Sequence, residues 1–151
     1  MSALWDASAR AGFADLLPPE HPFPTFDPGR LVELLAEERV RILVDDHGGE
    51  LRAHSTFGTS RDPDARASVG EVRSFFVGPA AWRTGVGTAL MARVLGELAE
   101  MGFEEATLWS FDANERANGF YEARGFSRDG SERREAVWAD VLEVRYRRTL
   151  P

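Results

Sequence analysis

Two glycines one residue apart mark the first stretch of the chain whose residue types suit a chemical role. Gly85 and Gly87 follow an apolar, strand-like run at residues 75–77 and open a segment with apolar residues at helical spacing. Because neither glycine carries a Cβ, the backbone here can come close to a ligand. The amides of a helix's first turn have no partner within the helix, and the helix dipole is positive there. The pattern predicts an anion site, most often for phosphate, with a plain structural turn as the alternative.

A second informative stretch, residues 114–126, begins one predicted strand later with the sequence Asn-Glu-Arg-Ala-Asn-Gly-Phe-Tyr-Glu-Ala-Arg-Gly-Phe. Asn114 and Tyr121 are seven residues apart in it. On a helix they would share one face about 10 Å apart.

Composition limits the kinds of protein that this chain can be. With 151 residues, 43% of them hydrophobic and 28% charged, it is typical of one globular domain with a hydrophobic core. No run of about 18 apolar residues indicates a membrane span, and the start lacks a signal-peptide pattern. The absence of cysteine excludes disulfides, thiolate metal sites and a cysteine nucleophile, which fits a cytoplasmic setting. A net charge of −7 argues against a nucleic-acid partner, and three scattered histidines indicate no metal site.

The elements that position the two stretches follow from periodicity and from glycine and proline. We expect helices over residues 3–17, 28 to about 38, 88–101 and 114 to about 124. Asp27 should cap the second helix, with Leu31, Leu34 and Leu35 facing inward. Strands are expected over residues 40–44, 50–59, 67–77, 106–111 and 141–147, with another beginning at 126–128. The polar segment 129–136 is expected to be a loop or an irregular edge. The prediction is one α/β domain over residues 1–151, with a mixed, mostly antiparallel sheet flanked by about four helices.

Taken together, the two stretches resemble the Gcn5-related N-acetyltransferase (GNAT) family. Its members carry Gln/Arg-x-x-Gly-x-Gly/Ala after a Val-x-Pro strand end, and then Asn-x-x-Ala-x-x-Phe-Tyr-x-x-x-Gly-Phe. The matching positions here are Val77, Pro79, Gly85, Gly87, Asn114, Ala117, Phe120, Tyr121, Gly125 and Phe126. The spacing between the two blocks is also that of the family, and the element order fits over about residues 3–150.

Two departures from the family pattern stand out. Trp82 occupies the Gln/Arg position beside the pyrophosphate, and Arg83 follows one place later. Because backbone amides supply most of such an anion site, we expect binding to survive with a modest loss or a substitute contact. The family fold also begins with a strand before its first helix. Either the start of this chain is truncated or its sheet lacks that edge strand.

The resemblance implies that acetyl-CoA is a cosubstrate whose acetyl group passes directly to an amine. Backbone groups of Phe75, Phe76 and Val77 would pair with the pantetheine arm, and Asn114 would also bind it. The pyrophosphate would lie on the amides of Arg83, Thr84, Gly85, Val86, Gly87 and Thr88.

The resemblance also suggests the acid–base groups. Tyr121 would reach the sulfur and protonate the thiolate leaving group, with packing in the core as the alternative. Glu71, on the strand before the glycine turn, would take a proton from the ammonium substrate; a salt-bridged strand residue, perhaps with Arg73, is the alternative. His54 on the preceding strand is a rival base or substrate contact, although a half-buried sheet histidine is the plainer interpretation.

The acceptor pocket would be formed by the first helix and the proline-rich loop that follows it. Trp5 and Phe13 fit core positions, whereas Phe23 and Phe26 in the loop are better candidates for substrate contacts. The predicted partner is a small-molecule or peptide amine.

Two other functions remain open at this point. Trp82 and the missing first strand leave room for a non-catalytic module of the same fold that binds coenzyme A as a sensor. A toxin-type acetyltransferase acting on charged tRNA is disfavoured because the chain is acidic. A sheet without its first strand would also expose an edge that favours a homodimer.

Overall fold

The computed structural model describes all 151 residues and confirms the predicted α/β class, with four α-helices and six strands. The elements, in chain order, are α1 (Ser2–Phe13), a 3-10 turn η1 (Ala14–Leu16), α2 (Pro28–Ala36), β1 (Val40–His47), β2 (Glu50–Thr59), β3 (Val69–Val77), η2 (Pro79–Ala81), α3 (Val86–Glu100), β4 (Glu105–Phe111), α4 (Glu115–Glu122), β5 (Ser127–Arg134), η3 (Ala136–Trp138) and β6 (Leu142–Thr149). No strand precedes α1, as expected from the sequence. None of the helices has the length and apolar character needed to cross a bilayer.

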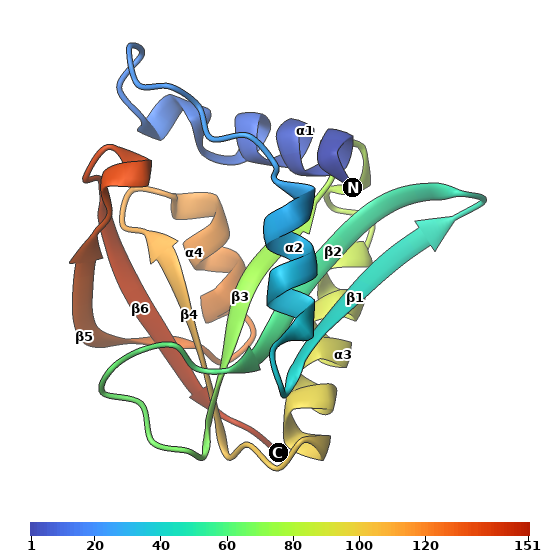
Figure 1. Cartoon of the computed structure of the whole chain (residues 1–151), viewed down its shortest axis with the longest axis vertical. Coiled ribbons are helices and arrows are strands. Elements are labelled where there is room, and N and C mark those ends of the chain that lie inside the picture. The colour runs from blue at the N-terminus through green and yellow to red at the C-terminus, as the bar shows by residue number, and fades with distance from the viewer.

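The six strands form one open sheet in the order β1-β2-β3-β4-β6-β5. Only β3 and β4 run parallel; every other neighbouring pair is antiparallel. In Figure 1, α3 lies behind β1 and β2, α2 lies in front of them, and α1 crosses the upper ends of the strands. The right-handed connection through α3 explains the single parallel pair, because a parallel crossover needs a helix between its strands.

The core lies between the sheet and α3. Apolar residues three and four positions apart, among them Met91, Val94 and Leu98, are fully buried against the sheet. From β6, Val144 and Tyr146 join the same cluster. Because side chains alternate along a strand, the residues between and beside these two face the opposite side of the sheet.

The parallel strands β3 and β4 separate after a short region of pairing. Their register holds from Val69 opposite Glu105 to Glu71 opposite Thr107, and no pair follows. On its other edge, β3 has a register shift against β2 between Thr56 and Phe57. Such an irregularity increases local bending and twist. The strands therefore diverge toward the end that carries the glycine turn (Figure 1).

Two local predictions were wrong, and a third had left two alternatives open. The first helix ends at Phe13 and continues as a 3-10 turn, instead of running to residue 17. Asp27 caps α2 as predicted, accepting from the amides of Gly29 at 2.9 Å and Arg30 at 3.3 Å, but α2 has no buried residue and Leu35 is 38% exposed. Of the two alternatives for residues 129–136, the irregular edge is confirmed: most of the segment belongs to edge strand β5, whose register against β6 shifts between Arg128 and Glu132.

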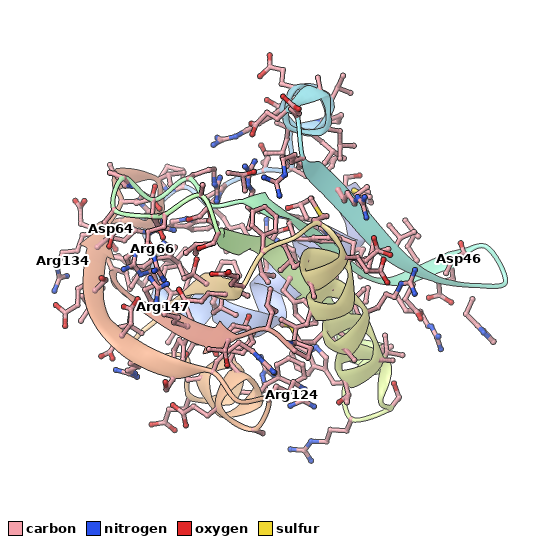
Figure 2. All side chains as sticks on the ribbon, turned by 90° about the horizontal axis from the view of Figure 1, so that it is seen from below. Asp46, Asp64, Arg66, Arg124, Arg134 and Arg147 are labelled. Carbon is pink, nitrogen blue, oxygen red and sulfur yellow. The ribbon has the colours of Figure 1, made fainter.

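A buried arginine ties the loop after β2 to the far edge of the sheet. Arg145 on β6 donates to Asp64 at 2.7 and 2.8 Å, to Asp129 at 2.7 Å and to Asp62 at 3.1 Å. Asp64 and Arg147 lie together on this side of the molecule, opposite the hairpin tip at Asp46 (Figure 2). Asp62 also accepts from the indole N–H of Trp109 at 2.9 Å, so the cluster positions an aromatic side chain of β4.

Candidate active site

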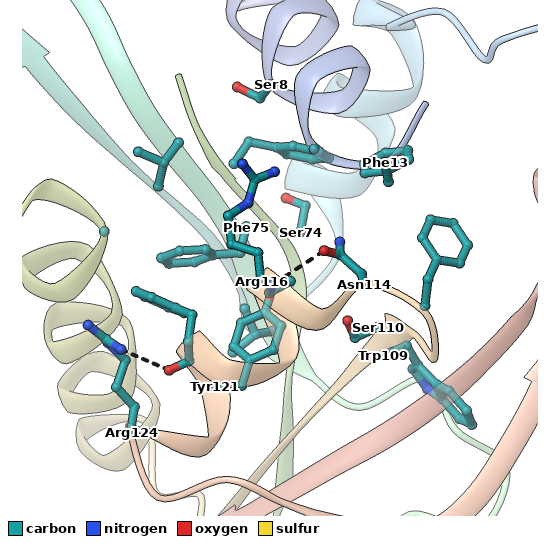
Figure 3. A pocket seen from close by; sticks show the side chains of 18 of the residues that line it. Ser8, Phe13, Ser74, Phe75, Trp109, Ser110, Asn114, Arg116, Tyr121 and Arg124 are labelled. Atoms are coloured by element: carbon teal, nitrogen blue, oxygen red, sulfur yellow. Dashed lines mark hydrogen bonds between the residues drawn. The ribbon is translucent and has the colours of Figure 1, made fainter. Parts of the chain in front are cut away.

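One cavity of about 850 Å³ occupies the region where β3 and β4 diverge. It is continuous from the glycine turn, through the N-terminal part of α4, to side chains of β4, β5 and β6. Its size falls in the range of small-molecule sites, and aromatic and charged residues share its wall. Figure 3 shows α1 covering one side of it and α4 the other.

The glycine turn has the geometry of an anion site at the N-terminus of α3. Gly85 has a φ of 90° and is the N-cap of this 15-residue helix, a conformation that glycine adopts without strain. A Cβ on Gly87 would lie 3.3 Å from Val77 Cγ2 and 3.4 Å from the Phe120 ring, so β3, α3 and α4 approach one another closely here. Of the predicted binding residues in the turn, Arg83, Gly85, Gly87 and Thr88 line the cavity.

Two members of the predicted set do not line the cavity. The Thr84 hydroxyl donates to the Ala81 carbonyl at 2.5 Å, and the Val86 side chain is 8% exposed within the core. Only their backbone groups can therefore serve a ligand. Phe75, Phe76 and Val77 line the cavity, and β3 has no strand partner on its β4 side beyond Glu71.

Trp82 is held by contacts from two directions. Its indole N–H donates to the Val77 carbonyl at 2.8 Å, and the guanidinium of Arg116 lies 3.6 Å from its ring centroid. Arg116 extends from α4 toward α1, where it donates to the Ala11 carbonyl at 3.3 Å (Figure 3). Trp82 thus brings a cation of α4 to the place where the family carries Gln or Arg.

Arg124, just after the C-terminus of α4, adds a second cation at the same end of the cavity. It lies 3.6 Å from the Phe120 ring centroid, donates to the Phe120 carbonyl at 2.8 Å and contacts the Thr88 hydroxyl. Its buried Nε has no hydrogen-bond partner, and burial lowers the pKa of its guanidinium. The sequence analysis missed Arg116 and Arg124 because only the fold brings α4 beside the glycine turn.

Asn114 and Tyr121 both line the cavity, from the two ends of α4. Asn114 is the N-cap and not a helical residue: its side chain accepts from the Ala117 amide at 3.3 Å (Figure 3). This leaves the amide nitrogen of its side chain available to a ligand. Half-buried Tyr121 packs against Phe126 and Tyr146 with ring centroids 6.1 Å apart in each pair. Burial raises the pKa of its phenol to about 12, so Tyr121 carries its proton near neutral pH.

Glu71 lies in the cavity wall but is firmly bound by Arg61. It is 2% exposed and accepts from Arg61 Nη2 at 2.7 Å, from Nε at 3.2 Å and from the backbone amide at 2.9 Å. Burial acts to raise the pKa of Glu71, but the hydrogen bonds and charge of Arg61 outweigh it and the pKa is lowered. The expected partner, Arg73, instead donates to Glu37 and to the Thr59 carbonyl, each at 2.8 Å.

A second buried carboxylate, Glu143 on β6, faces the same cavity and was missed by the sequence analysis. It is 4% exposed and accepts from Arg133 Nε at 3.2 Å and Nη2 at 3.1 Å. Burial raises the pKa of Glu143, against the effect of Arg133. The clean alternation of residues 141–147 could have placed Glu143 beside Arg145 on the polar face, but not beside the site.

Aromatic rings enclose the end of the cavity near Glu143. Phe13 of α1 lies 5.3 Å from both Phe111 and Trp138, and those two are 5.7 Å apart between ring centroids. All three line the cavity. The expected roles are thus partly reversed, because Phe13 reaches the cavity, whereas Phe23 packs behind it at 6.0 Å and, like Phe26, is not a lining residue.

His54 is buried outside the cavity, 3% exposed, with its ring centroid 5.2 Å from that of Phe76. Neither ring nitrogen has a hydrogen-bond partner. Burial, with a smaller effect of the N-terminal ammonium, lowers its pKa to about 4. Of the predicted site residues, His54 contacts Phe76, but it does not reach the cavity that Glu71 and Tyr121 line.

Comparisons with known proteins agree with this geometry. The model of the acetyltransferase (GNAT) family matches residues 8–126. The fold is similar to yncA of Salmonella typhimurium, solved with its cofactor acetyl-CoA, with 19% identity, a TM-score of 0.72 and coverage of 99% of this chain and 87% of that one. It is also similar to the PaiA N-acetyltransferase of Thermoplasma acidophilum in complex with coenzyme A, with 11% identity, a TM-score of 0.68 and coverage of 97% and 89%. A third similar structure is the ribosomal-protein-S18-alanine N-acetyltransferase of Escherichia coli, with 18% identity, a TM-score of 0.67 and coverage of 84% of this chain and 79% of that one.

At these identities the solved structures establish the fold, while the family match covers most of the chain. A search of curated proteins found no sequence match.

Proposed function

The chain belongs to the acetyltransferase (GNAT) family, whose members use acetyl-CoA as cosubstrate, and on this premise we propose that it transfers the acetyl group to a primary amine of a small molecule or peptide. The observation that carries the proposal is the continuity of the cavity. A single space joins the glycine turn, which suits a pyrophosphate, to Tyr121 and two buried carboxylates, which suit proton transfer. We also propose that residues 1–151 act as one domain.

The proposed cofactor position follows from the contacts around the diverging strands. The pyrophosphate lies on the amides of residues 83–88, with Arg116 and Arg124 close enough to offset its charge. The pantetheine arm then runs along β3 and pairs with backbone groups of residues 75–77, in the manner of an added strand. The Asn114 side chain contacts the arm from the N-terminus of α4.

The proposed reaction is a direct transfer without an acyl-enzyme. A carboxylate at the acceptor end, Glu71 or Glu143, takes one proton from the ammonium of the acceptor. The neutral amine attacks the thioester carbonyl carbon, a C–N bond forms and the C–S bond breaks. Tyr121 gives its proton to the departing thiolate and regains one from the nitrogen of the new amide. Acid–base help of this kind typically contributes 10²- to 10⁴-fold in rate.

A panel of primary amines tests the proposal, with release of the coenzyme A thiol and formation of the N-acetyl product measured together. We expect one thiol for each N-acetyl product with at least one amine. Tight binding of acetyl-CoA without turnover across the panel would instead support the non-catalytic module that the same fold allows.

A further inference from the structure

The acceptor end of the cavity holds more negative than positive charge. Arg61 and Arg133 are the cations there, and the carboxylates bound to them are Glu71, Glu143 and Glu135. A third arginine, Arg73, lines the cavity as well, but it is paired with Glu37 at 2.8 Å and so leaves this difference in charge unchanged. Two arginines therefore bind three carboxylates, and a cationic ligand could neutralise the one negative charge that remains.

The uncompensated charge lies on the Arg133 side. Arg61 is paired with Glu71 alone and donates three hydrogen bonds to it from its side chain and backbone. Arg133 is divided between Glu135 at 2.9 Å and Glu143 at 3.1 Å. Of these two, Glu135 has a side chain 43% exposed to water, whereas the Glu143 side chain is 6% exposed. Water can solvate Glu135, so the buried Glu143 is the carboxylate that gains most from a further cation.

Aromatic side chains line the cavity beside Glu143. Phe111 lies directly opposite Glu143 in the pairing of β4 with β6, and Phe111 contacts Phe13 and Trp138. Two residues before Phe111 on β4, the Trp109 ring is covered by the Arg133 guanidinium, which lies 4.3 Å from the ring centroid. An acceptor that places its ammonium on Glu143 must therefore lay the rest of its body against aromatic rings.

We propose that the acceptor is a primary amine attached to a flat apolar body, and that Glu143 binds its ammonium and is the catalytic base. This inference rests on the proposed acetyl transfer and names its substrate class and base. Glu143 takes one proton from the ammonium and later releases it to solvent. The amine nitrogen then attacks the thioester as described above, so no further reactant is needed.

The raised pKa of Glu143 suits this role better than the lowered pKa of Glu71, because a stronger base takes the proton more readily. Glu143→Gln keeps the size and the hydrogen-bond acceptor while removing the charge. Arg133 retains Glu135 in this variant, so no unpaired buried charge results. Glu132→Gln is the matched control, since Glu132 is exposed and points to the other face of β5.

The test is calorimetric titration of the full chain, loaded with coenzyme A, with 2-phenylethylamine, ethylamine and the neutral 2-phenylethanol. We expect the wild type to bind 2-phenylethylamine at least tenfold more tightly than ethylamine. Glu143→Gln should lower the affinity for 2-phenylethylamine at least tenfold and leave the affinities for 2-phenylethanol and coenzyme A unchanged. It should also lower kcat/KM for the amine at least 100-fold. Glu132→Gln should change each value less than twofold.

The inference is overturned if Glu143→Gln binds and acetylates the amine like the wild type, or if Glu71→Gln alone causes the loss. Equal affinity for ethylamine and 2-phenylethylamine would refute the flat apolar body. Amine binding that depends on Glu143 without thiol release would refute the proposed acetyl transfer and the base role, and would retain the ammonium site.

Discussion

Acidification should destabilise this fold through His54, because the burial of this side chain makes the free energy of unfolding depend on pH. The pKa of His54 is about 4 in the folded protein, against 6.5 for an exposed histidine. Because the folded-state pKa is the lower one, the unfolded chain binds the proton more readily. The contribution of His54 is thus fully present above pH 6.5 and is lost as the pH falls from 6.5 toward 4. From these two values the loss is roughly 2 kcal/mol at pH 5 and roughly 3 kcal/mol at pH 4.

Urea unfolding at pH 7 and pH 5 measures this effect. The carboxylates bound by arginines also lose stabilisation at low pH, so the wild type alone does not isolate the histidine. His54→Leu removes the titrating group and replaces two unpartnered ring nitrogens with apolar atoms of similar volume. We expect the stability difference between pH 7 and pH 5 to be smaller by about 2 kcal/mol in His54→Leu.

The matched control is His47→Asn, at the exposed end of β1. It should retain the wild-type difference between the two pH values. The reasoning is refuted if His54→Leu and the wild type lose the same free energy between pH 7 and pH 5.

Two further substitutions test the framework of the site. Gly87→Val should weaken coenzyme A binding at least tenfold, because a Cβ at this position already lies 3.3 Å from Val77 Cγ2. The control is Gly96→Ala, whose Cβ would meet no atom within 4 Å. It should keep the affinity for coenzyme A and stabilise α3 by about 1 kcal/mol. Equal calorimetric affinities for the two variants would contradict the close approach. Arg145→Met should cost about 3–5 kcal/mol in urea unfolding, because it leaves Asp62 and Asp64 without a cation, whereas Asp129 keeps Arg147. A cost below about 1 kcal/mol would show that the cluster adds little.

The order of elements and the cofactor end of the site could be predicted because local patterns encode them. Gly85 needs a positive φ that glycine supplies, and Asp27 before Pro28 marks a helix start, so both positions are recognisable without a structure. The exposure of Leu35 was not predicted, since periodicity shows which face of a helix is apolar and not whether another element covers it.

The acceptor end depends on pairings between distant strands. Nothing in the run of residues 141–147 shows that β6 lies between β4 and β5, and only this order brings Glu143 beside Phe111 and Arg133. In the same way, Glu71 and Arg61 are ten residues apart across a loop, so their bidentate contact depends on how that loop folds back. Local motifs predicted the residues at the glycine-turn end of the cavity, and sheet topology determines which residues line the other end.

Substitution of Tyr121 by Phe tests the central claim most directly, because it removes one hydroxyl and keeps the ring packed against Phe126. The measurement is steady-state thiol release with saturating amine, alongside calorimetric affinity for coenzyme A. The account predicts that kcat falls 10²- to 10⁴-fold while the affinity for coenzyme A stays within threefold of the wild type. An unchanged kcat, or a loss of turnover that accompanies an equal loss of coenzyme A affinity, would contradict it.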